Sequence, residues 1–177
     1  MLRKTVAVSL AILLCASFAL ASKHGKAEKG QDKGMAPWVV NIEKLTTGND
    51  HFRRAFWTGG KFQMTVMSIP AGGEIGLEVH PHGDQFIRVE EGEGRVLMGE
   101  TRDNLKYDKM VSDDWAIFIP AGYWHNIVNE GDEPLKVYVI YSPPEHPAGT
   151  VHETFEEGEA AHHHHGYDEE HDHDHDD

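Results

Sequence analysis

The sequence predicts an all-β domain between residues 37 and 152. Three observations lead to this fold class. The segment consists of short apolar runs of strand length, turn-forming residues separate these runs, and no part of it has a convincing helical period. Many short strands with turns at regular spacing are typical of a sandwich or a barrel.

The expected strands follow one another with clear breaks. Pro70–Gly73 ends one apolar run, Pro120–Gly122 separates two others, and Asn129–Asp132 precedes the last. Gly, Pro, Asn and Asp in such clusters favour tight turns, each through its own backbone preference. The expected strands are residues 38–42, 61–69, 75–80, 85–90, 94–98, 115–119, 125–128 and 135–141.

Residues 1–21 have the pattern of a secretory signal peptide. Arg3 and Lys4 form a positive start, and an apolar run that is short for a membrane span follows. Ala19 and Ala21 place small residues before a cleavage point after Ala21. We therefore expect a secreted or periplasmic protein that does not associate with the membrane after cleavage. An uncleaved membrane anchor is the alternative.

Two segments outside the domain have the composition of disordered chain. Residues 22–36 are rich in Lys, Gly, Glu and Gln, which is typical of a flexible linker. Residues 153–177, the C-terminal tail, contain seven of the 14 histidines interleaved with acidic residues. Almost no apolar residue is present to bury, so we expect the tail to be disordered. Its clustered imidazoles are expected to bind Zn, Ni or Cu.

The charge balance excludes one class of partner. The chain has 16 Lys and Arg against 30 Asp and Glu, a net charge of −14, which becomes −16 when Arg3 and Lys4 leave with the signal. Such an acidic protein repels phosphate backbones, so no nucleic-acid partner is expected. Cleavage also removes Cys15, the only cysteine, so metal ligands must be nitrogen or oxygen atoms.

Two spaced motifs contain polar residues that could bind a ligand. The first has its frame at the positions Gly72, Glu78, His80, Gln85 and Gly92. The second has its frame at the positions Asp114, Pro120, Gly122, His125 and Asn129. Both spacings resemble the motifs of the cupin superfamily, but Glu78 and Gln85 replace the usual His and Glu, and Asp114 replaces the usual Gly. The resemblance implies a jelly-roll, or double-stranded β-barrel, that holds a divalent metal ion.

The spacing gives the motif residues a common direction. Alternate residues of a strand face the same side, so Glu78 and His80 point together into the barrel. Gln85 returns on the next strand in phase with Ile87, and His125 arrives from the second motif. We expect Glu78, His80, Gln85 and His125 to bind one divalent ion.

The expected ligand set leaves several metals open. Two His, one carboxylate and one amide carry a ligand charge of −1 and suit Mn, Fe, Zn, Ni or Co. His82 is an alternative ligand to Gln85. It is also the best candidate for a free catalytic base. A barrel that has lost its metal, with Glu78 and Gln85 hydrogen-bonded to each other and to His80, is the other alternative.

Three functions remain open at this stage. The chain is similar to small single-domain cupins compared with the metal-binding domain of mannose-6-phosphate isomerases, which implies a small-molecule substrate and sugar or sugar-phosphate isomerisation. A dioxygenase-type reaction at Fe(II) is an enzymatic rival, since two His and one carboxylate match that ligand set. A non-catalytic binding protein for a ligand or metal is the third. The resemblance also makes a homodimer plausible, with residues 38–42 as an exchanged strand.

Overall fold

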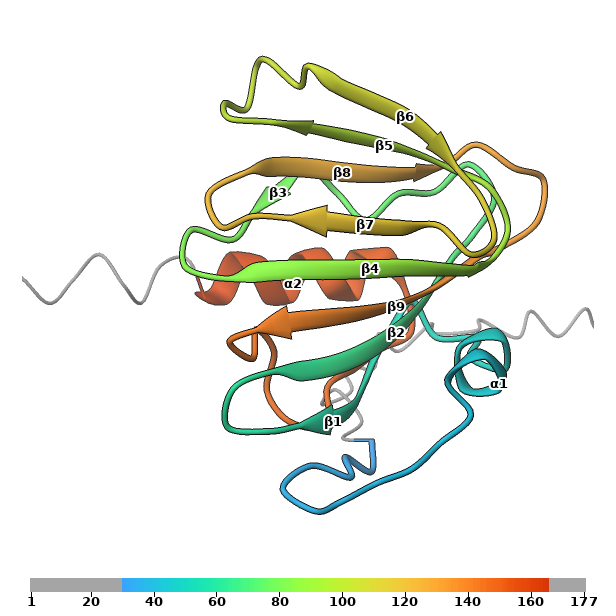
Figure 1. The fold of residues 1–177 in the computed structure, drawn as a ribbon, viewed down its shortest axis with the longest axis vertical. Coiled ribbons are helices and arrows are strands. Elements are labelled where there is room, and N and C mark those ends of the chain that lie inside the picture. Colours follow the sequence, from blue (N-terminus) through green and yellow to red (C-terminus); the bar gives the residue numbers. More distant parts are fainter. Residues whose placement is uncertain (1–29, 166–177) are drawn as a thin grey trace, which may run out of the picture.

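Two antiparallel sheets form the domain in the computed structural model, which describes residues 30–165. One sheet has the strand order β10-β1-β2-β9-β4-β7 and the other β3-β8-β5-β6 (Figure 1). The all-β prediction is confirmed, while residues 1–29 and 166–177, with the signal peptide and most of the tail, lie outside the described range. The strands are β1 Arg53–Thr58, β2 Gln63–Ile69, β3 Glu78–Val79, β4 Asp84–Glu91, β5 Gly94–Gly99, β6 Tyr107–Val111, β7 Ala116–Ile119, β8 Trp124–Asn129, β9 Leu135–Ser142 and β10 Val151–His152.

The core lies between the two sheets. Along β4, Gln85, Ile87 and Val89 are buried while the residues between them are more exposed, as expected for a strand with one face inward. Facing them, Val96 of β5 and Ile127 of β8 pair in register and are almost completely buried. This burial shows which face of each sheet points inward, and the inward side chains of the two sheets face one another.

The expected strand over residues 38–42 is wrong. The segment 37–40 forms no strand, and a short helix, α1 (Ile42–Thr47), begins at Ile42. The side chain of Asn41 accepts a hydrogen bond from the backbone N–H of Lys44 at 2.8 Å and so caps this helix. The apolar run favours a strand, but the capping residue at its end decides the local structure.

The described part of the expected linker is also ordered, contrary to prediction. The Asp32 carboxylate accepts hydrogen bonds from the hydroxyl of Thr58 at 2.6 Å and from the backbone N–H of Gly149 at 3.1 Å. The backbone N–H of Gly30 donates to the carbonyl of Gly149 at 2.8 Å. Residues 30–34, called the N-terminal latch below, thereby fasten the end of β1 to the segment after β9.

A helix replaces the start of the expected disordered tail. Helix α2 covers Phe155–His165, so the prediction of disorder is wrong for residues 155–165. Phe155 packs edge-to-face on Phe52 at 5.7 Å between ring centroids, and Gly158 is buried against the same ring. One aromatic anchor holds a helix that is otherwise polar. Within residues 30–165, neither helix is long and apolar enough to cross a membrane.

Candidate metal centre

The β3 and β8 strands bring the two sequence motifs together. Glu78 of β3 lies opposite His125 of β8 in the antiparallel register. The backbone N–H of Gly122, in the turn before β8, donates to the carbonyl of His80 at 2.9 Å. Gly122 has a φ of 81°, which a glycine adopts without strain, so the Pro-x-Gly turn can approach the end of β3 closely.

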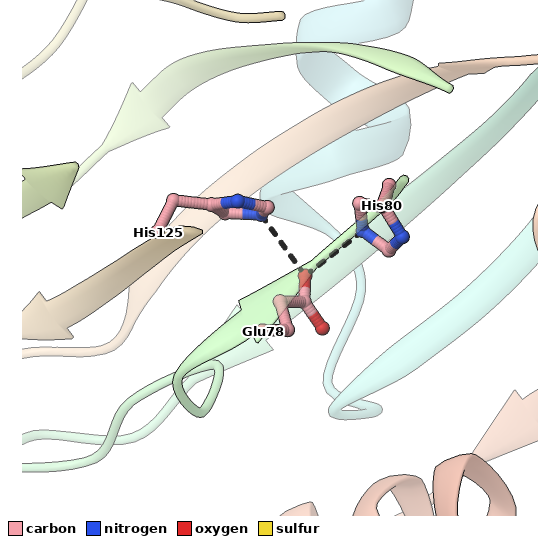
Figure 2. A group of neighbouring side chains, drawn as sticks. All are labelled: Glu78, His80 and His125. Carbon is pink, nitrogen blue, oxygen red and sulfur yellow. Dashed lines mark hydrogen bonds and ion pairs between the residues drawn. The ribbon is translucent and has the colours of Figure 1, made fainter. Parts of the chain in front are cut away.

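Glu78, His80 and His125 form one buried cluster, as Figure 2 shows. The Nε2 atoms of His80 and His125 each lie 3.3 Å from the same carboxylate oxygen, Oε1 of Glu78. All three ligand atoms lie within 4.8 Å of one another. Ligands bonded to one ion at ~2.1 Å are roughly 3–3.4 Å apart in tetrahedral or octahedral geometry, so the set can hold a metal with little movement.

The ring orientation of His125 leaves a nitrogen aimed at this cluster. Its Nδ1 atom lies 3.0 Å from the carbonyl oxygen of Tyr123, which can only accept, so Nδ1 carries the proton. The Nε2 atom then presents a lone pair, and it is buried without a hydrogen-bond partner. Two acceptors that face each other repel, so this contact is stable only with a cation between them, which either a proton or a metal ion can supply. This donor set therefore fits a metal ion.

Glu145 holds His80 from its other side. Its carboxylate lies 3.2 Å from Nδ1 of His80, while Nε2 faces Glu78. A carboxylate on the outer nitrogen of a ligating His fixes the ring and makes it a stronger ligand. The ring of Tyr141 also contacts that of His80 edge-on at 5.5 Å. Sequence reasoning missed Glu145, because it lies in the loop after β9, outside both motifs.

Electrostatics in the cluster favour a cation. Burial alone would raise the pKa of Glu78, but the imidazoles of His125 and His80 that face its carboxylate, together with the charge of Arg53, hold it well below its usual range. Burial alone would lower the pKa of His80, yet Glu145 and Glu78 raise it to about 9. Glu78 is thus an anion at neutral pH, and a proton on His80 competes with a metal for the same place.

Gln85, the expected fourth ligand, faces the interior of the domain. It is buried on the interior face of β4, between Ile119 of β7 and Tyr141 of β9 in the register. Its Oε1 atom is buried and makes no hydrogen bond. An amide oxygen in this state is available to a metal, and ligation by Gln85 stays a prediction.

His82 is placed differently from the cluster residues. It lies exposed in the turn between β3 and β4, while His80, two residues earlier, is buried. The group of ligand atoms described above does not include it. Pro81 and Gly83 turn the chain as the sequence suggested, so the roles of His82 as base or replacement ligand gain no support and remain predictions.

Comparisons with known proteins point to one family. Residues 65–141 match the Cupin domain family. The chain is 53% identical over 131 residues to YrkC of Bacillus subtilis (strain 168), covering 74% of this chain and 70% of that protein. It is 37% identical over 115 residues to L612 of Acanthamoeba polyphaga mimivirus, covering 64% and 70%. Both relatives are described as uncharacterized.

Solved structures agree on the fold. The crystal structure of BH2720 from Bacillus halodurans is 58% identical, with a TM-score of 0.73, and the match covers 73% of this chain and 98% of that one. TT1209 from Thermus thermophilus is 20% identical with a TM-score of 0.52, covering 60% and 98%. The second likeness concerns the fold alone.

Proposed function

Because the chain belongs to the cupin family, we propose that its barrel binds one divalent metal ion and uses it as a metal-dependent enzyme on a small molecule. Glu78, His80 and His125 are the ligands in this proposal, and Gln85 is the fourth. The observation that carries it is the buried Nε2 lone pair of His125, which faces the Glu78 carboxylate at 3.3 Å with no hydrogen-bond partner.

The chain's own groups have defined roles around the ion. Glu78 supplies the negative charge, and Glu145 and the carbonyl of Tyr123 hold the two imidazole rings in the orientation that ligation requires. Four protein ligands would leave coordination positions for an oxygen atom of the substrate. A bound metal would polarise that oxygen as a Lewis acid.

The reaction type has two candidates. Isomerisation of a sugar or sugar phosphate rests on the family resemblance and needs a separate base, for which His82 is the sequence-based candidate. Oxygen chemistry at Fe(II) is favoured by one specific observation, since Glu78, His80 and His125 are two His and one carboxylate on adjoining strands. Turnover by the Fe(II)-loaded and Mn(II)-loaded protein on oxidisable acids and on sugar phosphates separates the two.

Export and the histidine-rich tail belong to the same proposal. Residues 1–21 direct the protein out of the cytoplasm, and the histidines of residues 162–175 collect Zn, Ni or Cu in that compartment. A protein that stores or senses a ligand without turnover is the competing function that the tail favours.

Elemental analysis of the full-length protein tests the metal site. Equal amounts of the unaltered protein, His80→Ala, His125→Ala and the control His51→Ala, whose imidazole pairs with Glu153 instead, are passed over a chelating resin and analysed. The tail is identical in all four, so its contribution cancels. We expect about one tightly held ion per chain in the unaltered protein and the control, and a loss of at least tenfold in affinity in the other two. Equal metal content in all four would remove the basis of the proposal.

A further inference from the structure

We propose that the apolar part of the substrate binds in a pocket beside the metal centre, between β5, β6 and β7. The substrate class is a small molecule that joins a metal-binding oxygen group, such as a 2-oxo acid, to an apolar group of the size of one ring. The inference rests on the proposed metal site and goes further by naming what the site accepts.

One row of residues connects the metal ligands to this pocket. Across the four-stranded sheet, Glu78 lies opposite His125, His125 opposite Met98, and Met98 opposite Tyr107. Residues directly opposite each other in an antiparallel sheet point to the same face. Met98 is therefore one strand from His125, ~4.8 Å away in the pairing direction, and Tyr107 is two strands away.

The pocket beyond this row is mostly apolar. It has a volume of about 260 Å³, and its inner wall is formed by Val96, Met98, Val111 and Ile117. Tyr107 and Trp115, which are 53% and 44% exposed, form its rim. A dry cavity of about 150 Å³ is enough to bind benzene, so this pocket has room for one ring. We call it the side pocket.

A second, more polar hollow adjoins the side pocket. It has a volume of about 310 Å³ and shares Met98 and Tyr107 with the side pocket. Its other walls include the side chains of Glu100, Asn104 and Tyr123. Tyr123 is also the residue whose carbonyl orients His125. The polar hollow and the side pocket therefore meet at Met98, which lies opposite His125 in the sheet, and polar and apolar parts of one ligand can be separated there.

The lining argues against a sugar ring in the side pocket. A sugar carries hydroxyl groups on all sides, and the inner wall formed by Val96, Met98, Val111 and Ile117 offers no side-chain hydrogen-bond partner. Each buried hydroxyl without a partner costs binding free energy. Lys109, on the same face as Val96, contributes one cation to the lining, which suits an acidic ligand.

Calorimetric titration of the Mn(II)-loaded full-length protein with phenylpyruvate and with pyruvate tests the inference. Both probes have the same 2-oxo acid, and only the first has a ring. Burial of the ring predicts that phenylpyruvate binds about ten- to a hundredfold more tightly. Equal affinities for the two probes would overturn the inference.

Two variants on one strand provide the matched control. Lys109→Trp places a large side chain in the side pocket, whereas Met110→Trp places it on the outer face, opposite Arg95. Both positions are exposed, so both variants are expected to fold. The preference for phenylpyruvate should disappear in Lys109→Trp and persist in Met110→Trp. Trp115→Ala, which removes part of the rim, should weaken phenylpyruvate binding and leave pyruvate binding unchanged. A preference unaffected by Lys109→Trp in folded protein would contradict the pocket.

Indole separates this inference from the metal proposal, because it lacks a metal-binding oxygen. It should bind to the unaltered protein and to the metal-free His125→Ala variant, and not to Lys109→Trp. If the unaltered protein holds no metal but still binds indole, the metal site is rejected and the pocket is supported. If Lys109→Trp binds indole as tightly as the unaltered protein does, the pocket is rejected, whatever the metal content.

Discussion

The two open sides of the β-sandwich differ in how they are covered. On the side of β1 and β3, helix α2 closes the gap, with Phe155 on Phe52 and with Glu159 against Gly76. On the side of β6 and β7, large side chains remain in contact with solvent, including Trp115 at 44% and Phe118 at 71% exposure. No helix among residues 30–165 packs on that second side.

The two sides therefore have different roles. The closed side supports the metal ligands, and the open side gives solvent access to the side pocket. The closed side contains Gly76, two residues before the ligand Glu78. The φ of Gly76 is 93°, a conformation that favours glycine, and the Glu159 side chain lies close beside it. Close packing there holds the ligand strand in place. The open side leaves the side pocket reachable from solvent. One half of the barrel therefore fixes the ligands while the other half can admit a molecule.

The largest expected effect concerns pH, because Glu145 and Glu78 hold a proton on His80. The pKa of His80 is raised from 6.5 to about 9 by Glu145 and Glu78 in the metal-free protein. A metal must displace this proton, so its affinity should rise about tenfold per pH unit, roughly a hundredfold from pH 7 to 9, and level off above. Mn(II) titration of the full-length protein across this range measures it. A flat affinity would contradict the assignment.

The raised pKa of His80 also predicts how the stability of the metal-free protein depends on pH. The pKa of His80 is higher in the folded than in the unfolded chain, so its protonation stabilises the metal-free fold fully below pH 6.5. That contribution is lost as the pH rises through about 9. Thermal unfolding of metal-free protein should therefore occur at a lower temperature at pH 9.5 than at pH 7, and less so in Glu145→Gln.

The second effect compares the same substitution on the two sides. Phe155→Ala removes the anchor of α2 from a partly buried contact and should lower the free energy of unfolding by about 2–3 kcal/mol, somewhat less than for a fully buried ring. Phe118→Ala, on the open side, should change it by at most ~0.5 kcal/mol. Urea unfolding of both variants measures the difference. Equal costs would mean that α2 does not stabilise the closed side.

The smallest expected effect concerns Glu145, whose carboxylate contacts Nδ1 of His80. Glu145→Gln keeps a hydrogen-bond acceptor near Nδ1 but removes the charge, so metal affinity should fall by about tenfold, the low end for such outer partners. Glu153→Gln, whose carboxylate binds His51 at 2.8 Å instead, is the matched control and should leave metal affinity unchanged. An unchanged affinity in Glu145→Gln would show that Glu145 does not orient the ligand.

Sequence spacing predicted the part of the site that strand geometry controls. Glu78 and His80 share a face because they are two residues apart in a strand, and His125 joins them because the Pro-x-Gly turn starts the opposite strand. Glu145 follows no such period, since its position depends on how the loop after β9 folds back. No local pattern in the sequence contains that information.

The same distinction, between local sequence pattern and contacts made by the folded chain, explains where the predicted fold is wrong. Residues 38–42 have the β-branched composition of a strand, but a helix starts there because the Asn41 side chain accepts a hydrogen bond from the backbone N–H of Lys44. β6 is absent from the expected strands because its residues are mostly exposed and do not alternate in burial, and its strand character comes from pairing with β5. The sequence predicts disorder over α2 because its composition offers little to bury. In the structure, one contact, that of Phe155 with Phe52, provides this burial.

The N-terminal latch has a practical consequence for N-terminal truncation of the protein. Asp32 and Gly30 hold Gly149, which lies four residues after Glu145 in the same loop, and Glu145 in turn holds a ligand of the metal centre. A shortened protein that starts after residue 34 would keep every strand and both motifs. It would nevertheless lose the fastening of that loop, so the choice of first residue can alter metal retention at a site more than forty positions further along the chain.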